Sequence, residues 1–164
     1  MRIRKVKGLI KGRFLDIGCE RGDLAAHFRG FGLDRNPKGP KGRAVQFIIK
    51  DSHLPYRSGS FDTVTMVALI EHLDNIGFNL REIRRILSSK GQLIITTPSP
   101  KAKKMIELLS FFQFILDPSG IDHKFYFSKE DLYRLFGDNG FEIVCYKTFQ
   151  FGMNQIMVAR KADS

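Results

Sequence analysis

Phe14-Leu15-Asp16-Ile17-Gly18-Cys19-Glu20-Arg21-Gly22-Asp23-Leu24 is a short apolar run with an acid, followed by a turn with two glycines and the start of a helical pattern. A second apolar run, Gly32-Leu33-Asp34, also ends in an acid. A strand that meets a helix N-terminus through glycine allows backbone N–H groups to approach a ligand closely. A carboxylate at the tip of the next strand can bind both hydroxyls of a ribose. Together these features predict a site for a nucleoside-containing cofactor.

The bulk composition is that of a single domain with a proper core. The chain has 164 residues, of which 43% are hydrophobic and 27% charged. No apolar run approaches the roughly 18 residues that span a bilayer, and the basic N-terminus lacks the apolar stretch of a secretion signal. The two cysteines, Cys19 and Cys145, have no spacing typical of a metal site or a disulfide framework. We therefore expect a cytoplasmic protein.

The net charge of +10 favours anionic partners such as nucleic acid, phosphates or an acidic membrane surface. Much of this charge lies in the first 13 residues, and a smaller group is Lys101, Lys103 and Lys104. A solvated basic surface explains the pattern equally well, and the aromatic-interleaved signature of an RNA-binding sheet is missing. Nucleic acid is therefore an alternative partner rather than the favoured one.

Strand patterns alternate with helical ones, which predicts an α/β fold with a mainly parallel, doubly wound sheet. Two late strands with no helix between them predict an antiparallel hairpin at one edge. Helical spacing is clearest from Ile76 to Leu87, and after a helix start at Ser128 that is followed by Asp131. The predicted strands are Phe14–Ile17, Phe31–Leu33, Val45–Ile49, Thr63–Met66, Leu93–Thr97, Glu142–Thr148 and Met153–Ala159.

The ordered motifs resemble the class I S-adenosylmethionine-dependent methyltransferases from Arg13 to Ala159. Residues 15–22 are similar to the first motif of that family, Gly32-Leu33-Asp34 to the second, and Lys50-Asp51-Ser52 to the third. The stretch from Phe61-Asp62-Thr63-Val64 to Glu71-His72-Leu73 is similar to the fourth strand and the turn after it. The resemblance implies a Rossmann-like single domain with strand order 3-2-1-4-5-7-6. It divides the chain into a basic N-terminal segment, 1–12, and a cofactor-binding domain, 13–164.

The resemblance also implies a role for each motif residue toward S-adenosyl-L-methionine. The glycine turn accepts the methionine part of the cofactor, Asp34 and its neighbour bind the ribose, and the third motif meets the adenine. The backbone after the fourth strand flanks the methionine amino group. The cofactor-binding residues predicted in this way are Asp16, Gly18, Cys19, Glu20, Gly22, Asp34, Arg35, Asp51, Ser52, Met66 and Val67.

Two features depart from the family pattern. Glu20 stands where the family usually has glycine, so we expect the loop backbone there to avoid a positive φ. Only a dozen residues precede the first strand, where the family normally has helices that close over the cofactor, so we expect an open or partner-completed site. A nicotinamide-dependent dehydrogenase is disfavoured because residues 18–22 lack the G-x-G-x-x-G spacing.

Transfer to an oxygen needs a base, and histidine is the usual candidate near neutral pH. His72 and His123 are the predicted catalytic residues because the family places both loops above the cofactor. The Glu71-His72 pair partly resembles the Glu/His metal sets of ubiquinone-pathway and small-RNA methyltransferases. Those sets have a further acid three residues earlier, where this chain has Ala68, so we expect no metal.

Residues 105–116 form an apolar stretch with a narrow polar stripe, preceded by three lysines. The stretch suits a cover helix, a dimer face, contact with a membrane surface or a wall for an apolar acceptor. We predict O-methylation of a small, quinone-like or lipid-linked acceptor. The alternatives are a non-catalytic cofactor-binding subunit that supports a partner, and an RNA methyltransferase.

Overall fold

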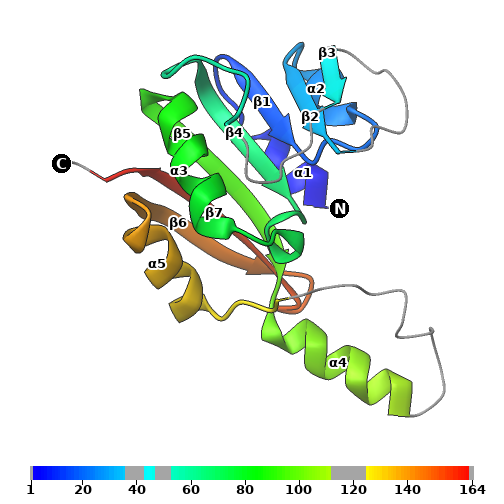
Figure 1. The fold of residues 1–164 in the computed structure, drawn as a ribbon. Helices are drawn as coiled ribbons and strands as arrows, with labels where there is room; N and C mark the ends of the chain where they lie inside the picture. The colour runs from blue at the N-terminus through cyan, green and yellow to red at the C-terminus, as the bar shows by residue number, and fades with distance from the viewer. Residues whose placement is uncertain (1, 36–42, 47–52, 112–124, 163–164) are drawn as a thin grey trace.

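A computed structural model describes residues 2–35, 43–46, 53–111 and 125–162, with only the backbone described at 43–46 and 106–111. Seven strands form one sheet in the order β3-β2-β1-β4-β5-β7-β6, which confirms the predicted order (Figure 1). The pairs are parallel from β3 to β5, and β7 is antiparallel to both β5 and β6. The strands are β1 (Phe14–Ile17), β2 (Phe31–Asp34), β3 (Arg43–Gln46), β4 (Phe61–Val67), β5 (Leu87–Pro98), β6 (Phe141–Phe149) and β7 (Asn154–Lys161).

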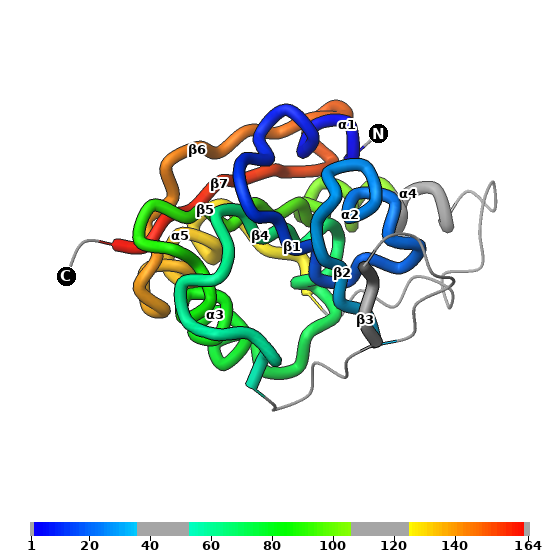
Figure 2. Tube along the Cα trace, turned by 90° about the horizontal axis from the view of Figure 1, so that it is seen from above, coloured from blue at the N-terminus to red at the C-terminus, as the bar shows by residue number. Residues whose placement is uncertain are grey.

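Helices cover both faces of the sheet. Figure 2 shows α1 and α2 over one face and α3 and α5 over the other, while α4 extends away from the body of the molecule in Figure 1. No helix in the described part of the chain is long and apolar enough to cross a bilayer. The helices are α1 (Arg2–Lys7), α2 (Asp23–His27), the short 3₁₀ turn η1 (Ile70–His72), α3 (Ile76–Ile86), α4 (Pro100–Phe111) and α5 (Lys129–Asp138).

The central strand β1 is buried at all four residues, as expected for a parallel strand covered on both faces. It lies between β2 and β4, with Ile17 opposite both Leu33 and Met66. The loops that follow β1, β2 and β4 therefore leave the same edge of the sheet. This edge is where doubly wound sheets bind their ligands.

The basic N-terminal segment, residues 1–12, contains the helix α1. Its one apolar inward residue, Val6, is fully buried in a cluster with Ile94, Phe149 and Ile156 of the sheet. Burial of a valine contributes on the order of 1.5–3 kcal/mol, enough to hold a short helix that would be unstable alone. Tertiary contact, rather than helix propensity, explains this element.

The two helices on the other face begin where the sequence signals predict. The side chain of Asn75 caps α3 by accepting a hydrogen bond from the Phe78 amide at 3.1 Å. At α5, Ser128 and Asp131 form a reciprocal capping box. Gly140, with φ of 74°, follows this helix and leads into β6.

Several element bounds differ from the sequence prediction. Helix α3 ends at Ile86 and β5 begins directly at Leu87, six residues before the predicted strand start at Leu93. Strand β3 begins at Arg43, two residues before the predicted start, and residues 47–49 of the prediction lie outside the described part. The turn between β6 and β7 is tight, with positive φ at Gln150, Phe151 and Gly152.

Candidate cofactor site

A cavity of about 520 Å³ opens at the edge of the sheet where β1 and β4 end. This volume lies within the range of small-molecule sites. Its walls come from four parts of the chain: α1, the loop after β1 with the start of α2, the end of β4, and the β6–β7 turn with the start of β7. The lining residues are Arg2, Ile3, Asp16, Gly18, Cys19, Glu20, Arg21, Asp23, Leu24, Val67, Ala68, Gln150 and Asn154.

Asp16 is the buried acid of the cavity, with only 4% of its surface exposed. The Thr65 hydroxyl on the neighbouring strand donates a hydrogen bond of 2.5 Å to Asp16 Oδ1. Burial raises the pKa of Asp16 to about 7; the Thr65 hydrogen bond opposes this rise, and the nearby charge of Asp34 adds to it. The carboxyl group is therefore poised to ionise fully when a cation is placed beside it.

In the loop after β1, residues 18–22 (the glycine loop), most backbone N–H groups already donate hydrogen bonds within the protein. Gly18 and Cys19 both donate to the Leu33 carbonyl, at 2.7 and 3.1 Å. The Glu20 amide donates to Asp34 Oδ2 at 2.7 Å, and the Gly22 amide to the Cys19 carbonyl at 2.7 Å. A loop that binds a phosphate must instead leave such donors free for the ligand. The loop is thus unsuited to a pyrophosphate, contrary to the donor role that its glycines suggested.

Gly18, in the loop after β1, and Gly32, in β2, stand where a side chain would collide with its neighbours. A Cβ added at Gly18, where φ is 77°, would lie 3.0 Å from the Leu69 side chain. A Cβ at Gly32 would lie 2.7 Å from the Cys19 sulfur. Burial raises the pKa of the Cys19 thiol to about 11, and the nearby charges of Asp16 and Asp34 make smaller contributions. Cys19 is therefore a packing residue and not a nucleophile.

Backbone strain is concentrated around the cavity. Among the described residues, five that are not glycine have a positive φ, and three of them line this cavity: Glu20 at 46°, Ala68 at 54° and Gln150 at 53°. The expectation that Glu20 avoids a positive φ is therefore wrong. Its conformation is held in place because its amide donates to Asp34 Oδ2. Strain of this kind persists where the surrounding structure enforces it, and it is common at ligand sites.

Arg2 closes the cavity from the side of α1. Its Nε and Nη2 atoms both donate to Asn154 Oδ1, at 2.9 and 2.6 Å. The Asn154 amide in turn donates to Gln150 Oε1 at 2.7 Å. A cation from the N-terminal helix is thus fixed in the wall of the cavity that also contains the acids of residues 16–23.

The structure brings together some of the sequence-predicted residues and leaves others apart. Five of them line the cavity: Asp16, Gly18, Cys19, Glu20 and Val67. Gly22 shapes the turn, Asp34 acts on the loop through its carboxylate, and Arg35 and Met66 do not line this cavity. The adenine-side residues Asp51 and Ser52, and the predicted base His123, lie outside the described residues.

His72, the other predicted base, is exposed and does not line the cavity. It belongs to η1, four residues after the lining residue Ala68. The preceding Glu71 is fully buried; its Oε2 accepts a hydrogen bond of 3.0 Å from Thr97, and its Oε1 has no partner within the described part of the chain. The described residues contain no cluster of potential metal ligands.

Of the eight lining residues that the sequence did not predict, Arg21, Asp23, Leu24 and Ala68 adjoin the predicted motifs, and the other four come from distant segments. Arg2, Ile3, Gln150 and Asn154 belong to the N-terminal helix and the last hairpin, and no short motif links them. The sequence shows the positive charge of Arg2, but its hydrogen-bond partner Asn154 is 152 residues away in the chain. Only the tertiary structure identifies this wall.

The arrangement of charges fits a zwitterionic ligand. Asp16, Glu20 and Asp23 supply carboxylates, and Arg2 and Arg21 supply guanidinium groups. An amino acid carries an ammonium and a carboxylate, which these walls complement. The methionine part of S-adenosylmethionine therefore fits the residues present, whereas a pyrophosphate does not.

Comparison with known proteins identifies the family of the chain. The model of a methyltransferase-domain family matches residues 6–146. The chain is 27% identical over 150 residues to a ubiquinone biosynthesis O-methyltransferase of Aeromonas salmonicida, covering 80% of this chain and 63% of that one. It is 30% identical over 115 residues to a demethylmenaquinone methyltransferase of Thermotoga maritima, covering 61% of this chain and 50% of that one. The chain thus spans less than two thirds of each of these relatives.

Solved structures show the same fold at lower identity. A methyltransferase of Thermotoga maritima, described as S-adenosylmethionine-dependent and a possible histamine N-methyltransferase, superposes with a TM-score of 0.77. The two chains are 21% identical, and the match covers 98% of this chain and 87% of that one. At this identity the likeness establishes the architecture alone.

Proposed function

Because this chain belongs to the methyltransferase-domain family whose methyl donor is S-adenosylmethionine, we propose that it methylates an oxygen of an aromatic, quinone-like or lipid-linked acceptor. The observation that carries the proposal is the cavity lined by both Asp16 and Arg2. S-adenosylmethionine, when bound, supplies an electrophilic methyl group on a sulfonium. The protein's task is to orient the reactants and to exclude water.

The cofactor is held by the residues described above. Asp16 and Glu20 bind the methionine ammonium, and Arg2 binds the carboxylate. We expect Asp34, the last residue of β2, and Arg35, directly after it, to bind the ribose. The resemblance to the family assigns the adenine to Asp51 and Ser52, which lie outside the described residues. Val67 and Met66 lie at the end of β4, beside the methionine part.

The acceptor class rests on the curated relatives and on His72. Two relatives are named for ubiquinone and menaquinone biosynthesis, which favours an aromatic ring that carries hydroxyl groups and an apolar tail. His72 is exposed in the segment that follows the cavity-lining end of β4, and we assign it the role of general base. The resemblance to the family offers His123 as the alternative base, and this residue lies outside the described residues.

The test is methyl transfer from isotope-labelled S-adenosylmethionine to a catechol with a short isoprenoid chain. We expect one added methyl group, located on oxygen by tandem mass spectrometry. His72→Ala should lower kcat by about 10²-fold or more, because positioned bases contribute 10²- to 10⁴-fold. Its affinity for S-adenosylhomocysteine should stay within about twofold of wild type. His27→Ala, which removes an exposed histidine of α2, is the matched control.

Three outcomes would contradict the proposal. A methyl group found on a ring carbon refutes the oxygen assignment. Binding of S-adenosylhomocysteine without turnover of any acceptor supports a non-catalytic subunit instead. Equal loss of activity in His27→Ala and His72→Ala refutes the specific role of His72.

A further inference from the structure

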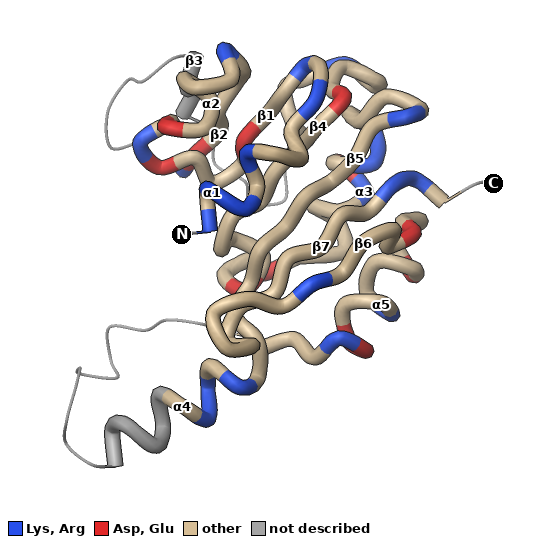
Figure 3. Tube along the Cα trace, turned by 180° about the vertical axis from the view of Figure 1, so that it is seen from behind, with Lys and Arg blue, Asp and Glu red and all other residues tan. Residues whose placement is uncertain are grey.

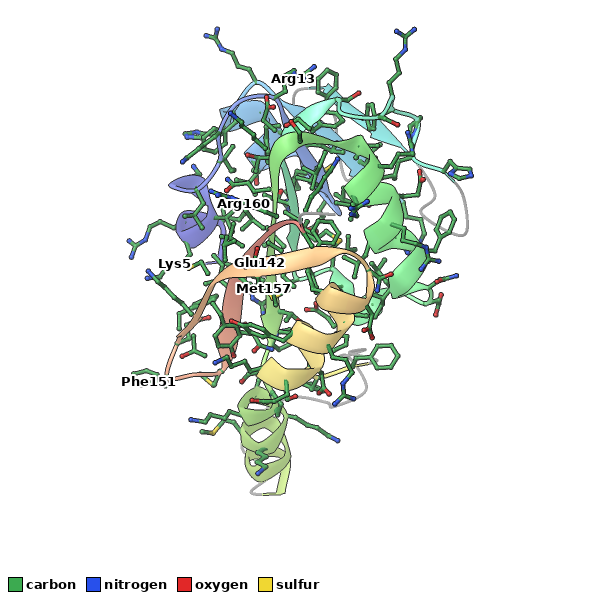
Figure 4. All side chains as sticks on the ribbon, turned by 90° about the vertical axis from the view of Figure 1, so that its left-hand side faces the viewer. Lys5, Arg13, Glu142, Phe151, Met157 and Arg160 are labelled. Carbon is green, nitrogen blue, oxygen red and sulfur yellow. The ribbon has the colours of Figure 1, made fainter. Side chains whose placement is uncertain are left out.

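The most exposed large apolar side chain in the described structure lies beside the mouth of the cavity. Phe151, at the tip of the β6–β7 turn, is 99% exposed. Figure 4 shows its side chain pointing out from the hairpin, on the same side of the molecule as Lys5 of α1. Its neighbour Gln150 lines the cavity. A fully exposed aromatic ring at a site entrance has no role in the core and suggests contact with another surface.

The turn that carries Phe151 is rigidly braced. The Ser99 hydroxyl donates to the Gly152 carbonyl at 2.6 Å, and the Ser99 amide donates to the Met153 carbonyl at 2.9 Å. On the other side, Asn154 links the turn to α1 through Arg2. The ring is thus presented on a fixed support, which lowers the entropy lost when it contacts a partner.

Cationic segments flank the turn on both sides. Helix α1 contributes four basic residues and no acidic one, and residues 100–105 at the start of α4 contribute three lysines and no acidic residue. Figure 3 shows these basic segments at the same end of the sheet as the β6–β7 turn. Lys101 approaches the turn directly, because a Cβ on Gly152 would lie 3.3 Å from its Cδ.

Apolar side chains accompany these cations. Lys104 and Met105 lie three and four positions after Lys101, so they share its face of α4. Met105 is 43% exposed, and Ile3 on α1 is 39% exposed. Protruding apolar side chains among lysines and arginines are the pattern by which proteins attach to anionic lipid surfaces. Nucleic acid would use the cations but would gain little from the aliphatic groups.

We propose that this surface, formed by Ile3, Lys5, Lys101, Lys104, Met105 and Phe151, docks the protein on an anionic lipid bilayer with the cavity mouth facing the membrane. Phe151 inserts between lipid head groups, and the lysines contact lipid phosphates. This inference does not depend on which acceptor is methylated. A docked cavity would nevertheless receive acceptors that reside in the bilayer.

The first test is flotation of the protein with vesicles at physiological salt, without cofactor or acceptor. We expect binding to phosphatidylcholine vesicles that contain 30% phosphatidylglycerol, and little binding to pure phosphatidylcholine. Lys101→Glu with Lys104→Glu should weaken binding by more than about 20-fold, since each cation near an anionic surface contributes about fivefold. Lys90→Glu, at the opposite end of β5, should leave it unchanged.

The second test uses the absence of tryptophan from the chain. Phe151→Trp introduces a single tryptophan, which can be excited apart from the tyrosines. Its emission should shift to shorter wavelength on anionic vesicles and be quenched by lipids with brominated acyl chains. Tyr133→Trp, on the exposed surface of α5, is the matched control and should show neither change. Because Phe151 is fully exposed, the substitution should not disturb folding, which circular dichroism checks.

Any of three results would overturn the proposal. The first is that vesicles do not bind the wild-type protein, and the second is that the charge-reversal variant binds as wild type does. The third is that the emission of Phe151→Trp stays constant in the presence of bound vesicles. Salt-sensitive binding of transfer RNA that depends on Phe151, with no vesicle binding, would identify a nucleic-acid surface instead.

Discussion

We expect Asp16 to make cofactor binding depend on pH. Burial raises its pKa to about 7 in the ligand-free protein, and an ammonium placed beside it stabilises the carboxylate. Binding below pH 7 therefore releases a proton, so the affinity for S-adenosylhomocysteine should rise by about tenfold between pH 6 and pH 8. Isothermal titration calorimetry in buffers of different ionisation enthalpy measures both the affinity and the proton release. Asp16→Asn should bind more weakly and lose the pH dependence; an unchanged pH dependence in that variant would contradict the assignment.

Arg2 offers a second test at the scale of one side chain. If its guanidinium binds the methionine carboxylate, Arg2→Gln should weaken S-adenosylhomocysteine binding by about tenfold or more, because charge-assisted hydrogen bonds contribute about 1.5–3 kcal/mol. Methylthioadenosine lacks the amino-acid part, so its affinity should not change. Arg4→Gln, which removes the same charge from an exposed position of α1, is the control. Equal losses for both ligands would mean that Arg2 acts only by holding α1 in place.

The helix α3 stabilises the loop that precedes β4 through one buried acid. Glu82 accepts hydrogen bonds from Arg85 and from the Leu54 amide, and it contacts His53. The Arg85 hydrogen bond is the main reason that the pKa of Glu82 falls from 4.5 to about 2, and His53 and Leu54 add to the effect. A depressed pKa stabilises the fold above the unfolded-state value and ceases to do so as pH falls toward 2.

Replacement of Glu82 should therefore have a pH-dependent effect on stability. Glu82→Gln should lower the free energy of unfolding by about 2–3 kcal/mol at pH 7, and the difference should shrink between pH 5 and pH 2. Urea unfolding followed by circular dichroism at several pH values measures this. Glu142→Gln, on the exposed side of β6, should change stability by less than about 0.5 kcal/mol. A constant deficit across the pH range would contradict the linkage.

Elements whose signals are local could be predicted from the sequence. The capping box at Ser128 and the apolar strand β1 depend on neighbouring residues, so their patterns identify them. Helix α1 was not predicted, because it has only six residues and its stability comes from the contact of Val6 with the sheet. The positive φ values of Glu20 and Ala68 could not be predicted either, because glycine is the residue that usually indicates such a conformation in a sequence.

At the scale of the molecule, the fold places the cavity where other doubly wound sheets bind a pyrophosphate. The loop N–H groups of Gly18, Cys19 and Glu20 are bonded within the protein, so they cannot bind phosphate oxygens. The cavity instead presents carboxylates together with Arg2. We therefore expect ligand selection to follow from the hydrogen bonds between the loop after β1 and the end of β2, and not from the sheet topology, which the two kinds of protein share.

Thermal unfolding tests this selection on the whole domain. A ligand at one hundred times its Kd adds about 2.7 kcal/mol to the free energy of unfolding. For a domain of 164 residues, S-adenosylhomocysteine should therefore raise Tm by about 5–10 °C. NAD at the same concentration should leave Tm unchanged, because its pyrophosphate finds no free donors in the loop. A rise with NAD that equals the rise with S-adenosylhomocysteine would show that the loop opens for phosphate, and the charge complementarity of the cavity would then not determine which ligand binds.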